Sequence, residues 1–170
     1  MTATENLELW DAYDEKEKLL GYDLIRGDAL AEGVYHLVST ILIRHRSGDF
    51  LLMKRDLGKK KYPGRWESSA GGSVLKGESP LEAAHREMLE ETGLRAASLK
   101  PIHKYKKGNC IYFCYLAITD GPKDSVTLQT GETIAYRWLN PTDFLAFMDS
   151  DEVIPQIKNE LQGFVQALLK

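Results

Sequence analysis

The sequence predicts a single α+β domain, and three observations support this fold class. The chain has 170 residues, 43% of them hydrophobic and 28% charged, which is the usage of an ordinary globular domain. Short apolar segments typical of strands are separated by turns at glycines and prolines. One well-capped helix and one amphipathic C-terminal helix complete the pattern. We expect one domain over residues 1–170, without an internal repeat.

Several segments have the β-branched and apolar composition of strands. The first of them ends at a turn-like Ser-Gly-Asp sequence at residues 47–49, after which the chain returns as a second strand. A basic loop at residues 56–64 follows, and its Tyr-Pro-Gly sequence should interrupt regular structure. The expected strands are residues 33–46, 50–55, 98–106, 109–119 and 133–139.

Residues 80–92 have the clearest helical pattern in the chain. Ser79 is placed to cap the first turn, Pro80 suits that turn, and Glu82 completes a capping box, while Gly93 supplies a C-terminal stop. A short helix is expected after Pro141. A final amphipathic helix over residues 153–169 should pack on the sheet through residues spaced three and four apart, namely Ile154, Ile157, Leu161, Phe164, Val165 and Leu168.

Charge and cysteine content exclude several classes of protein. A net charge of −3 and a pI near 5.8 provide no general field for DNA or RNA, so we expect no extended nucleic-acid binding. A small phosphorylated substrate remains compatible with this charge. Cys110 and Cys114 lack zinc-site spacing and are interpreted as reduced packing thiols, which favours a reducing compartment and a cytoplasmic protein. No leader and no uncharged apolar stretch of about 18 residues is evident, so we expect no membrane association.

The segment from Gly72 to Leu94 fits the pattern G-x5-E-x7-R-E-U-x-E-E-x-G-U, in which U is a bulky aliphatic residue. Met88 at one aliphatic position is a slight departure. The segment resembles the Nudix box, and on it the chain is identified as a member of the Nudix superfamily. The fixed positions are occupied by Gly72, Glu78, Arg86, Glu87, Glu90, Glu91 and Gly93.

The carboxylates of this segment are arranged for metal binding. Because successive helical residues are turned by about 100°, Glu87, Glu90 and Glu91 share one arc of the helix, while an apolar arc with Ala84 and Met88 can dock on the sheet. Like charges at this spacing repel, and a divalent cation would neutralise them. Oxygen ligands suit Mg²⁺, with Mn²⁺ as an alternative. Taken alone, an acidic helix is more often a solvated face; the complete pattern reverses that preference.

The resemblance implies a fold, a reaction and roles for individual residues. The fold is a mixed, curved β-sheet in an α/β/α sandwich. The reaction is hydrolysis of a diphosphate bond, with the carbonyl of Gly72 and the carboxylates of Glu87, Glu90 and Glu91 as metal ligands. The same three glutamates are the catalytic candidates, and which of them is the general base stays open. An ion pair between Glu78 and Arg86 would orient these ligands.

The chain up to the box also resembles the isopentenyl-diphosphate isomerases, a branch of the same superfamily. The likeness covers most of the first 95 residues, including LLMKRDLGKKKYPGRWESSAGG at residues 51–72. That branch carries a catalytic cysteine where this chain has Gly71 and a metal-binding histidine where it has Ser73, and it lacks the complete Arg86-Glu87 pair. The resemblance therefore implies an isomerase-like hydrolase.

Further site residues are implied outside the box. Arg55 and Lys59 match diphosphate contacts of the isomerase branch, and His36 matches a metal ligand there. Glu132 resembles a downstream carboxylate of some Nudix enzymes, on position alone. Plainer interpretations stay open: we favour His36 as a buried strand histidine and Trp66 as a core residue, and the basic loop around Lys59 is as well explained by solvation as by substrate binding.

The leading hypothesis is therefore a metal-dependent hydrolase of a nucleoside diphosphate derivative or a related organic diphosphate. An isomerase and a noncatalytic module that senses such a ligand are the alternatives. Gly71 argues against the isomerase, and the complete glutamate set argues against the noncatalytic module. Substrate identity and oligomeric state stay open, although Nudix relatives are often homodimers.

Overall fold

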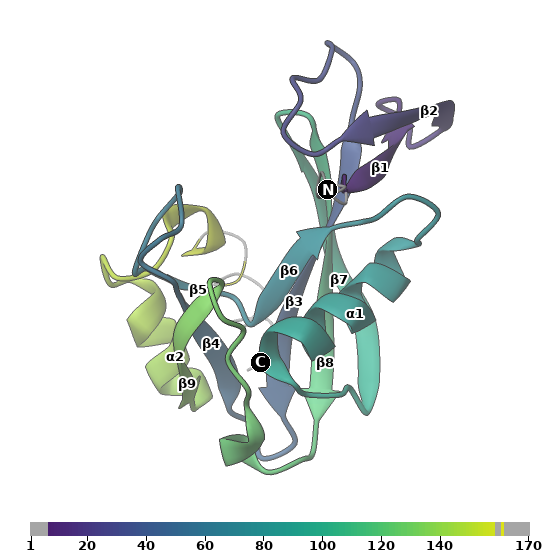
Figure 1. The fold of residues 1–170 in the computed structure, drawn as a ribbon. Coiled ribbons are helices and arrows are strands. Elements are labelled where there is room, and N and C mark those ends of the chain that lie inside the picture. Colours follow the sequence, from purple (N-terminus) through teal and green to yellow (C-terminus); the bar gives the residue numbers. More distant parts are fainter. Residues whose placement is uncertain (1–6, 159–160, 162–170) are drawn as a thin grey trace, which may run out of the picture.

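A mixed β-sheet with a helix on each face forms the body of the protein (Figure 1). The computed structural model describes residues 7–158 and residue 161. The elements are β1 Leu9–Tyr13, β2 Leu19–Ile25, β3 His36–His45, β4 Phe50–Arg55, β5 Trp66–Glu67, β6 Ala70–Ser73, α1 Pro80–Thr92, β7 Ser98–Lys107, β8 Cys110–Thr119, the 3₁₀ turn Lys123–Ser125, β9 Thr133–Leu139 and α2 Pro141–Met148.

The main sheet has seven strands and is organised around β3. Its order is β5-β4-β3-β8-β7, with β6 also paired to β3 and β9 also paired to β4. β3 runs parallel to β8, and the other pairs are antiparallel. The sheet is therefore mixed, as the Nudix resemblance implies.

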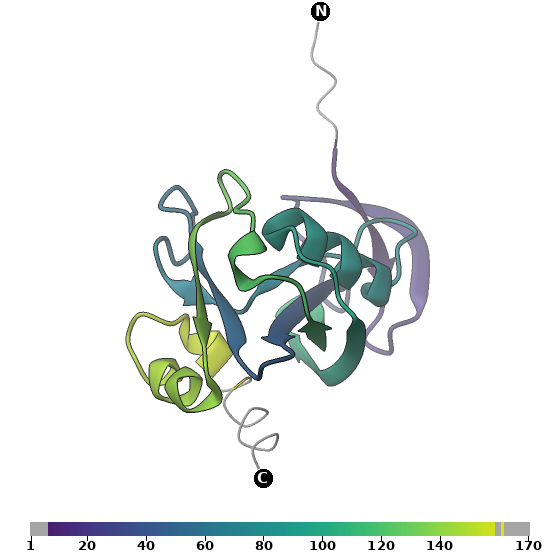
Figure 2. The ribbon, with the colours of Figure 1, turned by 90° about the horizontal axis from the view of Figure 1, so that it is seen from below.

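Alternating side chains of β3 and β4 face the two helices. Ile41 and Ile43 pack in a core with Met88 of α1, whereas Leu42 packs in a second core with Phe144 of α2. Successive strand residues point to opposite faces, so each strand contributes to both cores. Figure 2 shows α1 and α2 apart, with β3 and β4 between them. This arrangement is the predicted α/β/α sandwich.

A buried hydroxyl joins β3 to β4 where the two strands diverge. The only Cα register pair between these strands is Arg44 with Phe50, next to their connecting turn. Farther along, Ser69 Oγ accepts the N–H of Ile43 at 2.7 Å and donates to the carbonyl of Leu51 at 2.8 Å. Ser69 is fully buried, so its hydroxyl supplies the partners that the backbone ladder does not.

Helix α1 has the ends predicted from the sequence. Ser79 and Glu82 form the reciprocal capping box, and Gly93 ends the helix in a left-handed conformation with φ 72°. A cap of this kind stabilises a helix by about 1 kcal/mol. Ser39 Oγ of β3 also donates to the carbonyl of Pro80 at 2.7 Å, which fixes the start of α1 on the sheet.

The N-terminal hairpin of β1 and β2 was not predicted. Trp10 and Ala12 of β1 are buried, but most of β2 is exposed and shows no alternating apolar pattern. The hairpin packs back on the domain: the Trp10 ring stacks on His36 with centroids 4.0 Å apart, and Lys76 bonds to Asp23 at 2.6 Å. It therefore lies beside the segment that leads into α1.

The other predicted elements agree within a few residues, with two differences. Residues 70–73, for which no strand was predicted, form β6, which pairs with β3. The predicted C-terminal helix does not start at Val153, because Val153 forms a bridge with Trp66; helical residues begin at Pro155. The rest of that prediction lies outside the described residues. Among residues 7–158 and 161, no helix is long and apolar enough to cross a membrane.

Candidate active site

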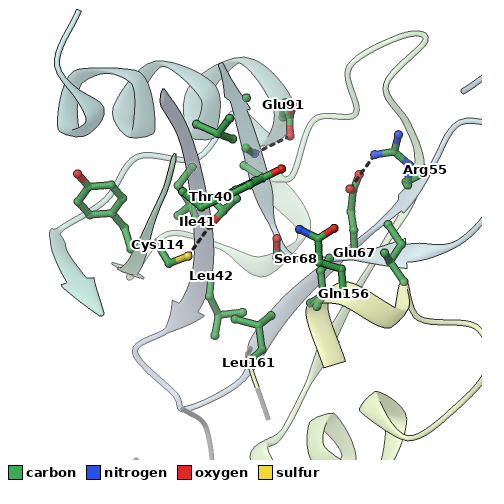
Figure 3. Close-up of a pocket in the computed structure, with 18 of the residues that line it drawn as sticks. Thr40, Ile41, Leu42, Arg55, Glu67, Ser68, Glu91, Cys114, Gln156 and Leu161 are labelled. Carbon is green, nitrogen blue, oxygen red and sulfur yellow. Dashed lines mark hydrogen bonds and ion pairs between the residues drawn. The ribbon is translucent and has the colours of Figure 1, made fainter. Parts of the chain in front are cut away.

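Helix α1 brings Glu87 and Glu91 against the glycines of β6. The N–H of Gly71 donates to Glu91 Oε2 at 3.3 Å, as the dashed line in Figure 3 shows. Glu91 and Gly72 both line a cavity of about 390 Å³ and a second, neighbouring cavity that Glu87 and Glu90 also line. The structure therefore brings the predicted carboxylates and the predicted backbone ligand to one place.

The two glycines of β6 are required by close approach, not by backbone conformation. A Cβ on Gly72 would lie 2.2 Å from Glu87 Oε1, and a Cβ on Gly71 would lie 2.8 Å from the carbonyl oxygen of Ser39. Any side chain at Gly72 would displace the Glu87 carboxylate. Any side chain at Gly71 would push β6 away from β3.

Arg86 holds three of the motif glutamates together. Its Nε and Nη2 donate to both oxygens of Glu78, at 2.8 and 2.9 Å, and its Nη1 donates to Glu87 at 2.6 Å and to Glu90 at 3.3 Å. Nη2 also donates to the carbonyl of Ser73 at 3.1 Å. The expected ion pair with Glu78 is thus formed and bidentate, and it ties the β6–α1 loop to the helix.

The carboxylates nearest the glycines are crowded and poorly solvated. Burial, together with the negative charges of Glu87, Glu67 and Glu132, raises the pKa of Glu91 to about 9, although the Gly71 hydrogen bond opposes this rise. Burial also raises the pKa of Glu87, although the Arg86 guanidinium opposes this. Glu91 is therefore the less compensated of the two carboxylates, since Arg86 pairs with Glu87.

Two basic residues, each paired with a glutamate, line the same cavity. Arg55 Nη1 donates to Glu67 Oε2 at 2.8 Å, and Lys59 forms an ion pair with Glu132 (Figure 3 shows the first pair). All four residues line the 390 Å³ cavity together with Glu91. The predicted substrate contacts Arg55 and Lys59 and the weak candidate Glu132 therefore share one cavity with the motif.

Two charged residues at this site were not found by sequence reasoning. Glu67 follows Trp66 on β5, and burial raises its pKa despite the neighbouring Arg55. Arg26, at the end of the N-terminal hairpin, lines both cavities and pairs with Glu8 at 2.7 Å. No local pattern marks either residue, because each reaches the site only through strand pairing or hairpin docking.

Other candidates lie away from the carboxylates. His36 lines neither of the two described cavities; it stacks on Trp10, and its Nε2 lies 3.1 Å from Cys110 Sγ. This placement favours the buried strand histidine. Trp66 is 4% exposed and belongs to the core beside α2, as interpreted from the sequence. Cys110 and Cys114 are not joined in a disulfide.

The donor set fits a hard divalent cation in its chemistry. It consists of carboxylates and a backbone carbonyl. The absence of a side chain at Gly72 leaves the space that the Glu87 carboxylate occupies. Glu87 and Glu91 lie close together, and a bound cation would offset the repulsion between their ionised carboxylates. Within the described part of the chain, however, no three acidic, histidine or cysteine side chains already converge as an ion cage, since Glu87 and Glu90 are held by Arg86.

Comparison with known proteins assigns the family. The model of the NUDIX domain matches residues 34–158. An uncharacterized Nudix hydrolase of Listeria monocytogenes serovar 1/2a is 35% identical over 153 residues, which cover 88% of this chain and 89% of that protein. An isopentenyl-diphosphate Delta-isomerase of Corynebacterium diphtheriae is 37% identical over 59 residues, covering 35% of this chain and 32% of the isomerase.

A crystal structure of a protein from Deinococcus radiodurans shares the fold. It has a TM-score of 0.73 at 22% identity, and the match covers 94% of this chain and 98% of that one.

The sequence likeness to the isomerase is partial, whereas the Listeria relative is similar over most of its length. Because the family match also spans residues 34–158, the chain belongs to the Nudix hydrolases, which are enzymes of the pyrophosphatase type.

Proposed function

We propose that this protein is a Mg²⁺- or Mn²⁺-dependent hydrolase that cleaves the diphosphate linkage of a nucleoside diphosphate derivative or a related organic diphosphate. Glu87, Glu90 and Glu91 would be the catalytic carboxylates, and with the carbonyl of Gly72 they would hold the metal. Arg55 and Lys59 would bind the substrate phosphates. Cys110 and Cys114, which are not joined in a disulfide, support a reducing location such as the cytoplasm.

One observation carries this proposal: Glu91 is bonded to the glycine strand at the wall of a cavity that Arg55 and Lys59 also line. A diphosphate needs positive charge along its oxygens and a carboxylate near the attacked phosphorus. The cavity offers Arg55 and Lys59 for the first need and Glu91 for the second. Both basic residues already pair with glutamates, so the oxygens of a bound phosphate would take the place of the glutamate carboxylates as their hydrogen-bond acceptors.

The chain's own residues divide the work of hydrolysis. Divalent cations held by Glu87, Glu90, Glu91 and the carbonyl of Gly72 would neutralise the diphosphate and lower the pKa of a water molecule. One of the three motif carboxylates accepts the proton of the attacking water, and Arg86 keeps the other carboxylates in position. Arg55 fixes the orientation of the substrate through its planar guanidinium, whose Nε donates to the Lys61 carbonyl.

The structure disfavours the isomerase alternative. That reaction would need a cysteine at the position of Gly71, where a Cβ meets the Ser39 carbonyl oxygen at 2.8 Å. The strand spacing of this chain therefore opposes the isomerase residue itself. A noncatalytic sensor is disfavoured because the buried, mutually repelling carboxylates destabilise a site that only has to bind an anion.

The proposal is tested by measuring phosphate products from a panel of diphosphates. ADP-ribose, nucleotide sugars, dinucleoside polyphosphates, nucleoside triphosphates, coenzyme A and isopentenyl diphosphate are incubated with Mg²⁺, with Mn²⁺ and with EDTA. We expect metal-dependent cleavage of at least one compound and background rates in EDTA. Cleavage that continues in EDTA would refute the metal dependence, and rearrangement of isopentenyl diphosphate without cleavage would restore the isomerase.

Alanine at the two glycines of β6 should separate activity from stability. Gly72→Ala is expected to melt like the wild type, because the obstructing atom is the end of the flexible Glu87 side chain, but to lose on the order of 10²-fold in kcat as Glu87 moves. Gly71→Ala is expected to lose about 1–3 kcal/mol of unfolding free energy, because it meets backbone. Urea denaturation and initial rates measure both effects. Equal behaviour of the two variants would contradict this assignment.

A further inference from the structure

The loop of residues 56–65 between β4 and β5 contains a residue in a strained backbone conformation. Tyr62 has a φ of 51°, which lies in the left-handed region. Bulky residues rarely adopt this conformation, because the Cβ then approaches the following carbonyl oxygen. Tyr62 also precedes Pro63, and a proline favours an extended conformation of the residue before it. Two separate steric effects therefore oppose the observed backbone of Tyr62.

Packing of the Tyr62 side chain does not account for this strain. The side chain is 46% exposed, so little apolar surface is gained by placing it there. A strained conformation persists only where the surrounding structure imposes it, and such residues are concentrated at functional sites. The backbone contacts of the loop impose it here.

The loop is attached to Arg55 through its backbone. The N–H of Arg65 donates to the carbonyl of Tyr62 at 3.3 Å, which closes a turn with Pro63 and Gly64 at its centre. The N–H of Gly64 donates to the Arg55 carbonyl at 3.2 Å, and the N–H of Arg55 donates to the Arg65 carbonyl at 2.9 Å. Proline followed by a glycine with φ 68° suits a type II turn. The segment after Tyr62 is therefore fixed against β4.

The left-handed conformation orients the peptide unit before Tyr62. This peptide unit is planar, so rotation about φ of Tyr62 turns the Lys61 carbonyl with it. At φ 51° the carbonyl accepts a hydrogen bond from Arg55 Nε at 3.1 Å. At the negative φ that an L-residue prefers, the plane would be turned by more than about 100°, and the carbonyl would point away from Nε. The strained backbone and the Nε hydrogen bond therefore depend on each other.

We propose that Tyr62 is a positioning residue for substrate binding: its left-handed backbone directs the Lys61 carbonyl at Arg55 and so holds the guanidinium ready for the diphosphate. This inference rests on the proposed function, in which Arg55 binds the substrate phosphates. It adds the residue that sets the orientation of Arg55. Tyr62 acts through its backbone, and its ring has no part in this role.

The hydrogen bond at Nε leaves the other nitrogens of Arg55 for an anion. Nη1 donates to Glu67 Oε2 at 2.8 Å, as the dashed line in Figure 3 shows. A long arginine side chain loses rotamer freedom when it binds a phosphate, and that loss weakens binding. The bond to Lys61 removes part of this freedom before the substrate arrives. A phosphate oxygen can then replace Glu67 at Nη1 while the Nε bond stays in place.

The first test separates the backbone of Tyr62 from its ring. Tyr62→Gly removes the ring but accepts a positive φ, whereas Tyr62→Val favours an extended backbone. For a compound that the wild type cleaves, we expect Tyr62→Val to raise KM about 10-fold and to change kcat less than about 3-fold. Tyr62→Gly should raise KM by less than about 3-fold, because glycine keeps the carbonyl orientation. Equal KM values for the two variants would overturn the proposal.

A double-mutant cycle with Arg55→Lys tests whether the effect passes through Arg55. Lysine has no N–H at the Nε position, so this bond to the Lys61 carbonyl is lost. Tyr62→Val should therefore raise KM less than about 2-fold in the Arg55→Lys background. An undiminished effect in that background would show that Tyr62 acts through other contacts. Tyr22→Val is the matched control and should have the wild-type KM, because Tyr22 is 49% exposed on β2 and lines neither cavity.

Hydrogen exchange at Arg55 Nε separates this result from failure of the proposed function. The Nε–H signal is followed by nuclear magnetic resonance in the absence of substrate. Tyr62→Val should exchange this proton at least about 10-fold faster than the wild type and Tyr62→Gly, because the Lys61 carbonyl no longer accepts it. If no compound is cleaved, faster exchange in Tyr62→Val alone still supports the positioning of Arg55 by Tyr62. Equal exchange in the three proteins refutes it.

Discussion

Glu91→Gln is expected to lower kcat by about 10²- to 10⁴-fold, the usual contribution of a catalytic carboxylate. The change removes the carboxylate beside Gly71 and almost no volume. Because burial already disfavours the ionised form of Glu91, the variant should melt at or above the wild-type temperature. Initial rates with saturating Mg²⁺ and thermal unfolding followed by circular dichroism measure the two effects.

Glu32→Gln provides the matched control for this variant. Glu32 is exposed in the loop before β3, and it lines neither cavity, so its rate should equal that of the wild type. Addition of Mg²⁺ should also raise the melting temperature of Glu32→Gln more than that of Glu91→Gln, because a bound ion stabilises only the folded protein. A Glu91→Gln enzyme with full turnover would show that the reaction does not use this carboxylate.

Arg86→Ala should be the most destabilising change at the site, with a loss of about 2–3 kcal/mol in the free energy of unfolding. The guanidinium side chain is 23% exposed and serves Glu78, Glu87 and Glu90 at once, so its removal leaves three carboxylates close together without their shared cation. Activity should fall as well, because the β6–α1 loop loses its bidentate attachment. Urea denaturation at pH 7 measures the stability.

Two further variants separate the effect of the Arg86 charge from that of its bidentate hydrogen bonds and from that of losing an arginine elsewhere. Arg95→Ala removes an exposed arginine just after the same helix and should cost little. Arg86→Lys keeps the charge but cannot donate in a fork to both oxygens of Glu78, so it should be intermediate. If Arg86→Lys and the wild type are equally stable and active, charge alone suffices and the bidentate geometry has no role.

The sequence was most informative where local chemistry decides the structure. The ends of α1 follow from Ser79, Glu82 and Gly93, whose effects act within one helical turn, and the predicted helix has the observed bounds. The strands β4 and β9 were also predicted with their observed bounds, since their composition and turns are local signals. The positions of the motif glutamates on one side of α1 were predictable because they follow from residue spacing along a helix.

The parts that depend on contacts between distant segments were not predictable. β1 and β2 form a hairpin whose outer strand is mostly exposed, so no apolar alternation indicates it. Glu67 and Arg26 enter the site from β5 and from this hairpin, and nothing near either residue in the chain marks it as part of a cavity. The bridge of Val153 with Trp66 likewise replaces a helical turn because a strand partner is available there.

The hydroxyl of Ser69 links β3 to β4 at a point where the two strands share no backbone hydrogen bonds. Two halves of a sheet that share a full backbone ladder resist bending, but here the join between β3 and β4 away from their turn passes through one side chain. The spacing of β3 and β4 at this point therefore depends on the length of one serine side chain.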